Sequence, residues 1–238
     1  SSSKSYAQVN GGTVATVQAV RTDNASQSCV PGYTGSQNVN VALSYTNPSN
    51  GGLAVAFSND NSTYVDLTTT ISTSLNFSVG SATAHLYLAY PDVGQLGITI
   101  TDPNNVLISG GVATGTDNFV VYPANLQITA TDLSDSDLNG GAHIAGQPFK
   151  LNIQAVNVDG NVTPNYAPGA LEINPTMLSS MPDAAKSTLM FYSNQADDNI
   201  LTSKGDNWTS ANVTFTNGIY STSSASFDDV GEFQIDVR

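Results

Sequence analysis

Hydrophobic and polar residues alternate along many short stretches of this chain, most clearly at residues 149–155, which read FKLNIQA. This period of two is that of a β-strand with one buried face, and Asp159-Gly160-Asn161 shortly after it is a turn signal. Only one helical turn is predicted, at residues 180–186, and residues 108–118 (ISGGVATGTDN) predict a glycine-rich turn. Strands are predicted near residues 12–20, 38–46, 52–58, 63–77, 84–90, 95–101, 117–122, 125–131, 148–157, 169–173, 188–193, 211–216, 218–227 and 232–238.

One corner and the strand that follows it occur twice in the chain. Residues 90–100 read YPDVGQLGITI and residues 227–237 read FDDVGEFQIDV, so an aromatic residue, Asp-Val-Gly and three alternating apolar positions coincide. Two copies of one unit explain this match. We therefore predict an all-β protein of two tandem antiparallel β-sandwiches, residues 1–122 and 123–238, the second with an insert near 174–207.

The second predicted sandwich has no strand after residues 232–238 in this sequence. We expect that the fold closes with an earlier segment or that residues beyond Arg238 complete it; an open edge would instead invite dimerisation or a donated strand.

The charge of the chain limits its partners. The chain has nineteen acidic residues, 17 of them Asp, and six basic residues, which gives a net charge of −13. Such a surface repels phosphate backbones and anionic membranes, so we exclude nucleic acid as a partner and expect no membrane insertion. It suits solubility in an external medium, divalent cations or a basic partner.

Cys29 is the only cysteine, so a disulfide framework does not hold this fold together. The chain shows no signal peptide, transmembrane run or lipidation motif. We interpret it as a fragment of a larger exported protein with an extracellular or cell-surface location.

Carboxylates cluster at residues 131–140, where Asp132, Asp135 and Asp137 offer oxygen ligands at close spacing. Calcium binds such oxygens, but the loop lacks the bidentate Glu of an EF-hand. Calcium is therefore the one candidate cofactor, and the alternative is a solvated loop whose side chains cap their own backbone. For Asp92 and Asp229, at the repeated corner, the sequence predicts such a cap, with Gly94 and Gly231 supplying backbone freedom.

The sequence offers little material for catalysis. The two histidines are His85, on the predicted solvated face of a strand, and His143, in a loop. No Gly-x-Ser-x-Gly elbow is present, and His and Cys are too few for a zinc site. We therefore expect no enzymatic activity, although pairs of Asp carboxylates brought together in space remain an alternative.

Sugar binding is the stronger active hypothesis, because exposed aromatic rings stack on pyranose rings while Asn and Asp bind hydroxyls. Tyr192 and Trp208 are the candidate ligand-binding residues. The alternative is that Trp208 fills the core of the second sandwich.

The repeated corner resembles the E–F corner of immunoglobulin-like domains. The resemblance implies that the two predicted sandwiches are immunoglobulin-like. That family has Tyr where Leu96 and Phe233 stand and Cys where Ile98 and Ile235 stand. The resemblance therefore implies neither a tyrosine-corner hydrogen bond nor an inter-sheet disulfide here, and apolar packing must replace both.

The order of motifs along the whole chain is similar to the C-terminal region of MshQ-like proteins, exported bacterial proteins associated with the mannose-sensitive haemagglutinin type IV pilus. The matching motifs are CVP at 29–31, SYTNP at 44–48, YPDVG at 90–94, AGQPF at 145–149, DG at 159–160 and NY at 165–166.

The resemblance implies a non-enzymatic structural or presentation module of a pilus-associated or cell-surface adhesin. Its expected partners are other domains of the same protein or pilus components. The alternatives are direct adhesion dependent on surface glycans or calcium, and an accessory domain of an exported glycan-active enzyme.

Overall fold

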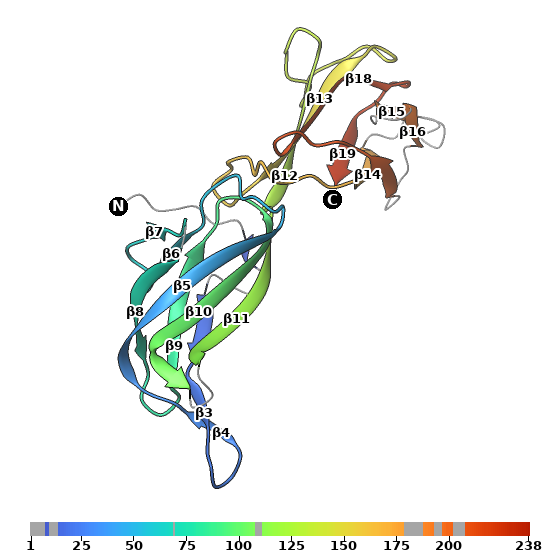
Figure 1. The fold of residues 1–238 in the computed structure, drawn as a ribbon. Coiled ribbons are helices and arrows are strands. Elements are labelled where there is room, and N and C mark those ends of the chain that lie inside the picture. The colour runs from blue at the N-terminus through green and yellow to red at the C-terminus, as the bar shows by residue number, and fades with distance from the viewer. Residues whose placement is uncertain are drawn as a thin grey trace. The chain divides into compact units, whose positions relative to one another are not determined.

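The computed structural model describes residues 8–9, 14–68, 70–107, 111–178, 188–192, 197–201 and 208–238. These residues form β-strands joined by turns and loops (Figure 1), which confirms the all-β prediction. In the described ranges, no helix is long and apolar enough to cross a membrane. The chain divides into two compact units: unit 1 is Ser1–Ala124 with Asn157–Asn165, and unit 2 is Asn125–Val156 with Tyr166–Arg238.

The described part of unit 1 contains two larger antiparallel sheets and a small hairpin. The five-stranded sheet has the order β1-β11-β10-β5-β8, and the four-stranded sheet has the order β2-β9-β6-β7. The strands of the first are β1 (Gln8–Val9), β11 (Gly111–Tyr122), β10 (Gly94–Leu107), β5 (Gly35–Asn47) and β8 (Ile71–Phe77). Those of the second are β2 (Val14–Gln18), β9 (Thr83–Ala89), β6 (Ala56–Ser58) and β7 (Val65–Asp66), and the hairpin is β3 (Val20–Thr22) with β4 (Cys29–Pro31).

The core of unit 1 lies between its two larger sheets. Val39 and Val41 of β5 point into it from one sheet, and Leu86 and Leu88 of β9 from the other. The alternation in the sequence thus places one face of each strand in the core and leaves the other for polar side chains.

The β10–β11 hairpin corrects one prediction. Residues 108–118 were expected to form a turn, but β11 begins at Gly111 and pairs with β10 from Leu107↔Gly111 to Gly94↔Val121, with an irregularity between Asp102 and Val106. The threonines of this stretch explain the difference, because they face threonines of β10: Thr99 and Thr116 hydroxyls lie 3.1 Å apart. Such cross-strand hydroxyl pairs favour a strand despite the neighbouring glycines.

In the described part of unit 2, one sheet has five strands, in the order β12-β13-β18-β15-β16, and the other has three, in the order β17-β14-β19. Apolar residues from both sheets, among them Leu151 and Ile153 of β13 and Ile173 of β14, form its core. The strands are β12 (Asn125–Thr131), β13 (Phe149–Val156), β18 (Ile219–Phe227), β15 (Thr188–Tyr192), β16 (Asp197–Leu201), β17 (Thr209–Asn212), β14 (Ala170–Met177) and β19 (Phe233–Val237).

Three strands of unit 2 depart from the predicted ranges, and one of them is β17, which spans Thr209–Asn212 where residues 211–216 were predicted. β16 lies within the predicted insert and was not expected, and β14 continues past residue 173 through Pro175, which pairs with Ile235. Arg238 and Glu172 form a hydrogen-bonded pair, in which each backbone N–H donates to the other residue's carbonyl. Hydrogen-bonded and non-hydrogen-bonded pairs alternate along an antiparallel ladder, so the pair of Pro175 and Ile235 is a non-hydrogen-bonded one. Pro175 therefore removes no ladder bond to β19. The predicted helical turn at 180–186 lies outside the described residues.

The repeated corner has the same local geometry in both units, as the sequence predicts. The Asp92 carboxylate accepts a hydrogen bond from the Val93 N–H at 2.9 Å, and Asp229 accepts one from Val230 at 2.8 Å. Gly94 and Gly231 have φ of 150° and 147°, values that residues with a Cβ rarely adopt. The predicted caps and the predicted role of the glycines are therefore confirmed.

Candidate functional site

The acidic loop after β12 is the first candidate site. The carboxylate of Asp132, at the start of this loop, stabilises the loop's own backbone. Asp132 Oδ1 accepts hydrogen bonds from the backbone N–H groups of Ser134 and Ser136, both at 2.8 Å. These donors, Ser136 first, lower the pKa of Asp132. Asp132 therefore acts as the cap of a tight turn.

The other two predicted metal ligands are also used locally. Asp135, in the left-handed region with φ of 68°, forms an ion pair with Lys150 Nζ at 2.6 Å, and Asp137 accepts a hydrogen bond from the Asn139 N–H at 2.9 Å. Within the described ranges, no group of three or more His, Cys, Asp or Glu side chains is arranged to hold a metal ion. A calcium site and a self-capped loop are the two alternatives for these residues, and calcium titration decides between them.

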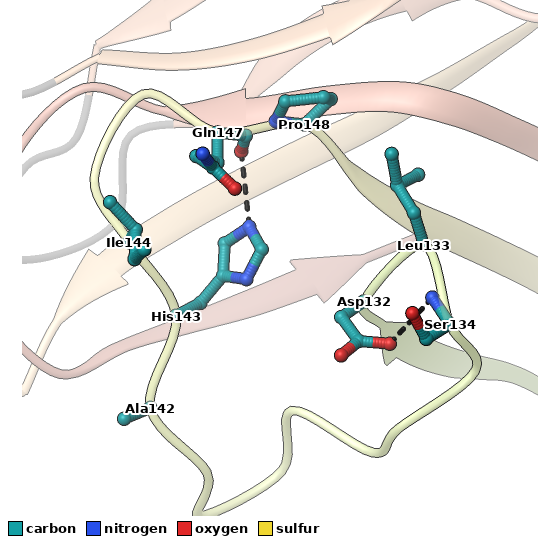
Figure 2. Close-up of a pocket in the computed structure, with 8 residues that line it drawn as sticks. All are labelled: Asp132, Leu133, Ser134, Ala142, His143, Ile144, Gln147 and Pro148. Atoms are coloured by element: carbon teal, nitrogen blue, oxygen red, sulfur yellow. Dashed lines mark hydrogen bonds between the residues drawn. The ribbon is translucent and has the colours of Figure 1, made fainter.

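A pocket of about 310 Å³ opens beside this loop (Figure 2). His143 reaches into it, with Nε2 3.1 Å from the Gln147 carbonyl oxygen and its ring edge against Phe149 at 5.8 Å between centroids. Asp132 and Ser134 line the opposite side in the figure.

These three side chains do not form the hydrogen-bonded relay of a nucleophilic triad, which runs from carboxylate through imidazole to hydroxyl. The Asp132 oxygen is bonded to backbone amides, and the His143 nitrogen contacts a backbone carbonyl. The pocket therefore offers a shallow polar surface with an exposed imidazole.

The two predicted sugar-binding residues lie in different described segments. Tyr192 is the last residue of β15, and its side chain lies outside the described atoms. Trp208 is partly buried, and the Arg238 guanidinium lies over its ring at 4.3 Å from the centroid. Arg238 in turn donates from Nε to Glu172 Oε2 at 2.6 Å. A sugar stacking on Trp208 would therefore use the other ring face or displace Arg238.

The most buried polar cluster of the described chain lies at the corner of unit 1. Asp92 is 0% exposed, and its Oδ1 accepts hydrogen bonds from the N–H groups of Val93 and Asn165, both at 2.9 Å. Asn165 Nδ2 also donates to the Tyr90 hydroxyl at 3.0 Å, and Asn157 Nδ2 donates to the Pro91 carbonyl at 3.1 Å. The segment Asn157–Asn165 thus closes over the corner as part of unit 1.

Burial dominates the electrostatics of this cluster. Asp92 Oδ2 is buried and has no hydrogen-bond partner, and burial raises the pKa of the Asp92 carboxyl. Burial, followed by the charge of Asp92, also raises the pKa of Tyr90. The sequence predicts the cap made by Asp92 but not its partner segment, because a single sequence carries no signal for contact between residues 73 positions apart.

Facing antiparallel sheets around closed apolar cores make this an immunoglobulin-like β-sandwich protein, and a comparison with family models gives the same class. The chain belongs to the family described as a domain of unknown function, DUF6701: the model of its first Ig-like domain matches residues 2–116, and that of its third domain matches residues 92–238. No curated protein and no solved structure matches the chain.

Proposed function

We propose that this chain is a non-enzymatic structural module that presents another part of a bacterial exported adhesin, pilus-associated or at the cell surface. The observation that carries the proposal is the use of its carboxylates. In the described residues, seven aspartates at turns, corners or a strand irregularity accept hydrogen bonds from nearby backbone N–H groups: Asp23, Asp60, Asp92, Asp102, Asp132, Asp137 and Asp229.

This use of acidic residues fits a scaffold better than a reactive site. The hydrogen bonds to Asp23 and Asp60, from serine neighbours first, lower the pKa of each carboxyl, so these turns remain charged and capped at neutral pH. A catalytic carboxylate pair would instead need groups held close together with pKa values pushed apart.

The polar face of the larger unit 1 sheet supports the same proposal. Hydroxyl groups of neighbouring strands pair across it, Ser36 with Ser74 at 2.6 Å and Thr101 with Thr114 at 3.4 Å. Such pairs satisfy polar groups within the sheet. A surface of this kind suits a module that spaces other domains in an external medium.

A glycan array separates presentation from direct adhesion. The purified chain is applied with and without calcium, and we expect the binding signal on every glycan to stay at background. Retention on a defined glycan that is lost in Trp208→Ala would overturn the proposal and make direct adhesion the function. Tyr122→Ala is the matched control, because Tyr122 is an exposed aromatic residue, 42% accessible, in unit 1.

A further inference from the structure

The chain passes between its two units three times. It leaves unit 1 after Ala124, returns to it for residues Asn157–Asn165, and enters unit 2 again at Tyr166. The segment Asn157–Asn165, the strap, therefore belongs to unit 1 although it lies between β13 and β14, two strands of unit 2. A single connection would let two sandwiches fold separately, and the strap adds two further connections.

Both ends of the strap are bound at one point of unit 1, the corner. Asn157 Nδ2 donates to the Pro91 carbonyl at 3.1 Å, and the Asn165 N–H donates to Asp92 Oδ1 at 2.9 Å. Asn165 Nδ2 donates in addition to the Tyr90 hydroxyl at 3.0 Å. Since Pro91 and Asp92 are adjacent in the sequence, the same turn of unit 1 holds the strap where it begins and where it ends.

The strap is packed as closely as a protein interior. Thr163, between its two ends, is fully buried. A Cβ on Gly52 of unit 1 would lie 3.1 Å from Asn165 Oδ1 and 3.1 Å from Asp92 Oδ2, which is closer than most real Cβ contacts. The strap therefore leaves no space for a further side chain at this place, and its contacts with unit 1 are those of a core rather than of a loose surface loop.

No flexible linker separates the strap from unit 2 at either end. Val156, the last residue of β13, is 2% exposed, and Asn157, the first residue of the strap, is 3% exposed. At the other end, Asn165 is bonded to unit 1, and the ring of Tyr166 packs edge-on against Phe215 of the unit 2 core at 5.1 Å between centroids. In each pair of adjacent residues, one residue is thus fixed in unit 1 and the other in unit 2.

Folding of unit 2 lowers the entropy cost of binding the strap to the corner. When β13 and β14 are paired in their sheets, they hold the strap at both ends, so fewer conformations are lost when it binds. When unit 2 unfolds, the strap becomes part of a free chain, and the same hydrogen bonds must compensate a larger loss of entropy. The strap therefore binds unit 1 more weakly in that state.

We propose that the strap couples the stabilities of the two units, so that its hydrogen bonds to the corner of unit 1 also stabilise unit 2. Opening of unit 2 releases the strap and breaks these bonds, although their donors and acceptors all belong to unit 1. Coupling between two equilibria is reciprocal, so the anchoring of the strap in unit 2 also stabilises unit 1. This coupling goes beyond the presentation role and does not depend on it.

The first test is amide hydrogen exchange in NMR on the full 238-residue chain with Asn165→Ala. The substitution removes the amide group that donates to Tyr90 of unit 1. Exchange at Leu96 reports the opening of unit 1, and exchange at Leu151 and Ile173, one in each sheet of unit 2, reports the opening of unit 2. We expect exchange about tenfold or more faster in both units. Faster exchange in unit 1 alone, with unit 2 at the wild-type rate, would overturn the proposal.

Asn161→Ala is the matched control, because the side chain of Asn161 is exposed in the same strap. We expect it to leave exchange in both units unchanged. If it changes exchange in unit 2 as much as Asn165→Ala does, any alteration of the strap disturbs β13 and β14 locally, and the bonds to the corner are not the cause.

Tyr90→Phe tests the same bond from the side of unit 1 and decides the question if Asn165→Ala fails to fold. It removes only the hydroxyl that Asn165 contacts, and exchange at Leu151 should become about fivefold faster. An unchanged rate at Leu151 would overturn the proposal. Tyr33→Phe is the matched control, because Tyr33 packs against Phe77 in a different core cluster of unit 1. It should leave Leu151 unchanged, and an equal effect there would contradict the strap as the route of the coupling.

Reciprocity gives a test in the opposite direction. Phe215→Leu removes the ring on which Tyr166 packs, which weakens the anchor of the strap in unit 2, and exchange at Leu96 of unit 1 should become several-fold faster. Phe227→Leu is the matched control in unit 2, because Phe227 stacks on Phe233. It should leave exchange at Leu96 unchanged. Equal rates at Leu96 in the two variants would contradict the coupling.

Discussion

Truncating Asn165 to alanine should destabilise unit 1, although the residue lies in a surface loop. The Asn165 backbone N–H still donates to Asp92 in the variant, so Asn165→Ala removes only what its amide group does. That amide donates to the Tyr90 hydroxyl at 3.0 Å, and a second contact to the Val93 carbonyl, at 3.5 Å, is at the limit of a hydrogen bond.

The magnitude follows from the burial of Tyr90, which is 1% exposed. A buried hydroxyl that loses its partner costs about 1–3 kcal/mol, whereas the long contact adds little. We therefore expect a loss of about 2 kcal/mol in the unfolding free energy of unit 1. Tyr90→Phe should cost about 1 kcal/mol, and the double variant should fall short of the sum, because both changes remove one interaction.

Amide hydrogen exchange in β10 reads the stability of unit 1 separately from that of unit 2. A loss of 2 kcal/mol corresponds to exchange about 30-fold faster at Leu96 and Ile98, if these amides exchange through unfolding of the unit. Asn161→Ala is the control, because Asn161 is exposed in the same loop. Equal exchange rates in the Asn165 and Asn161 variants would refute the stabilising role of this contact.

Three further predictions follow from the turns. Burial raises the pKa of Asp92 above its ordinary 3.8, so the contribution of this carboxyl to stability is complete below that pH and is lost as the pH rises through the folded pKa. In urea unfolding, Asp92→Asn should therefore gain stability relative to the wild type as the pH is raised above 3.8. Gly94→Ala places a Cβ 2.7 Å from the Asn47 carbonyl oxygen at φ of 150°, and should cost about 2 kcal/mol or more, whereas Gly115→Ala, with open space around it, should stay within about 0.5 kcal/mol. Calcium, with EDTA as control, should leave the midpoint of thermal unfolding unchanged because Asp135 already pairs with Lys150, and a rise of several degrees would make the acidic loop a metal site.

The sequence predicts the fold where strands alternate cleanly. β12 begins and ends at the predicted residues, and β13 and β18 lie within one residue of the predicted ranges, because their apolar positions mark one buried face. For β11 the prediction finds only residues 117–122 and misses the first half, because glycine and threonine have opposite strand preferences and only the pairing with β10 decides between them. β16 pairs with β15, a contact that its own residues do not indicate.

For the candidate sites, the sequence predicts local contacts and misses distant ones. The caps made by Asp92 and Asp229 follow from the Asp-Val-Gly corner alone. The contact between Asp92 and Asn165 depends on the folded chain, as does the stacking of Arg238 on Trp208. The groove that the loop after β12 lines together with β19 also depends on the folded chain.

Domain replacement in the full-length protein tests the presentation role most directly. In the adhesin that the proposal implies, deletion of residues 1–238 should lower attachment of the bacteria to the surface that the adhesin binds. An unrelated pair of tandem β-sandwiches of similar length, inserted at the same place, should restore attachment because the proposed role is spacing. If the replacement leaves attachment as low as the deletion does, while the protein is displayed at wild-type levels, this chain itself makes the adhesive contact and the presentation account is wrong.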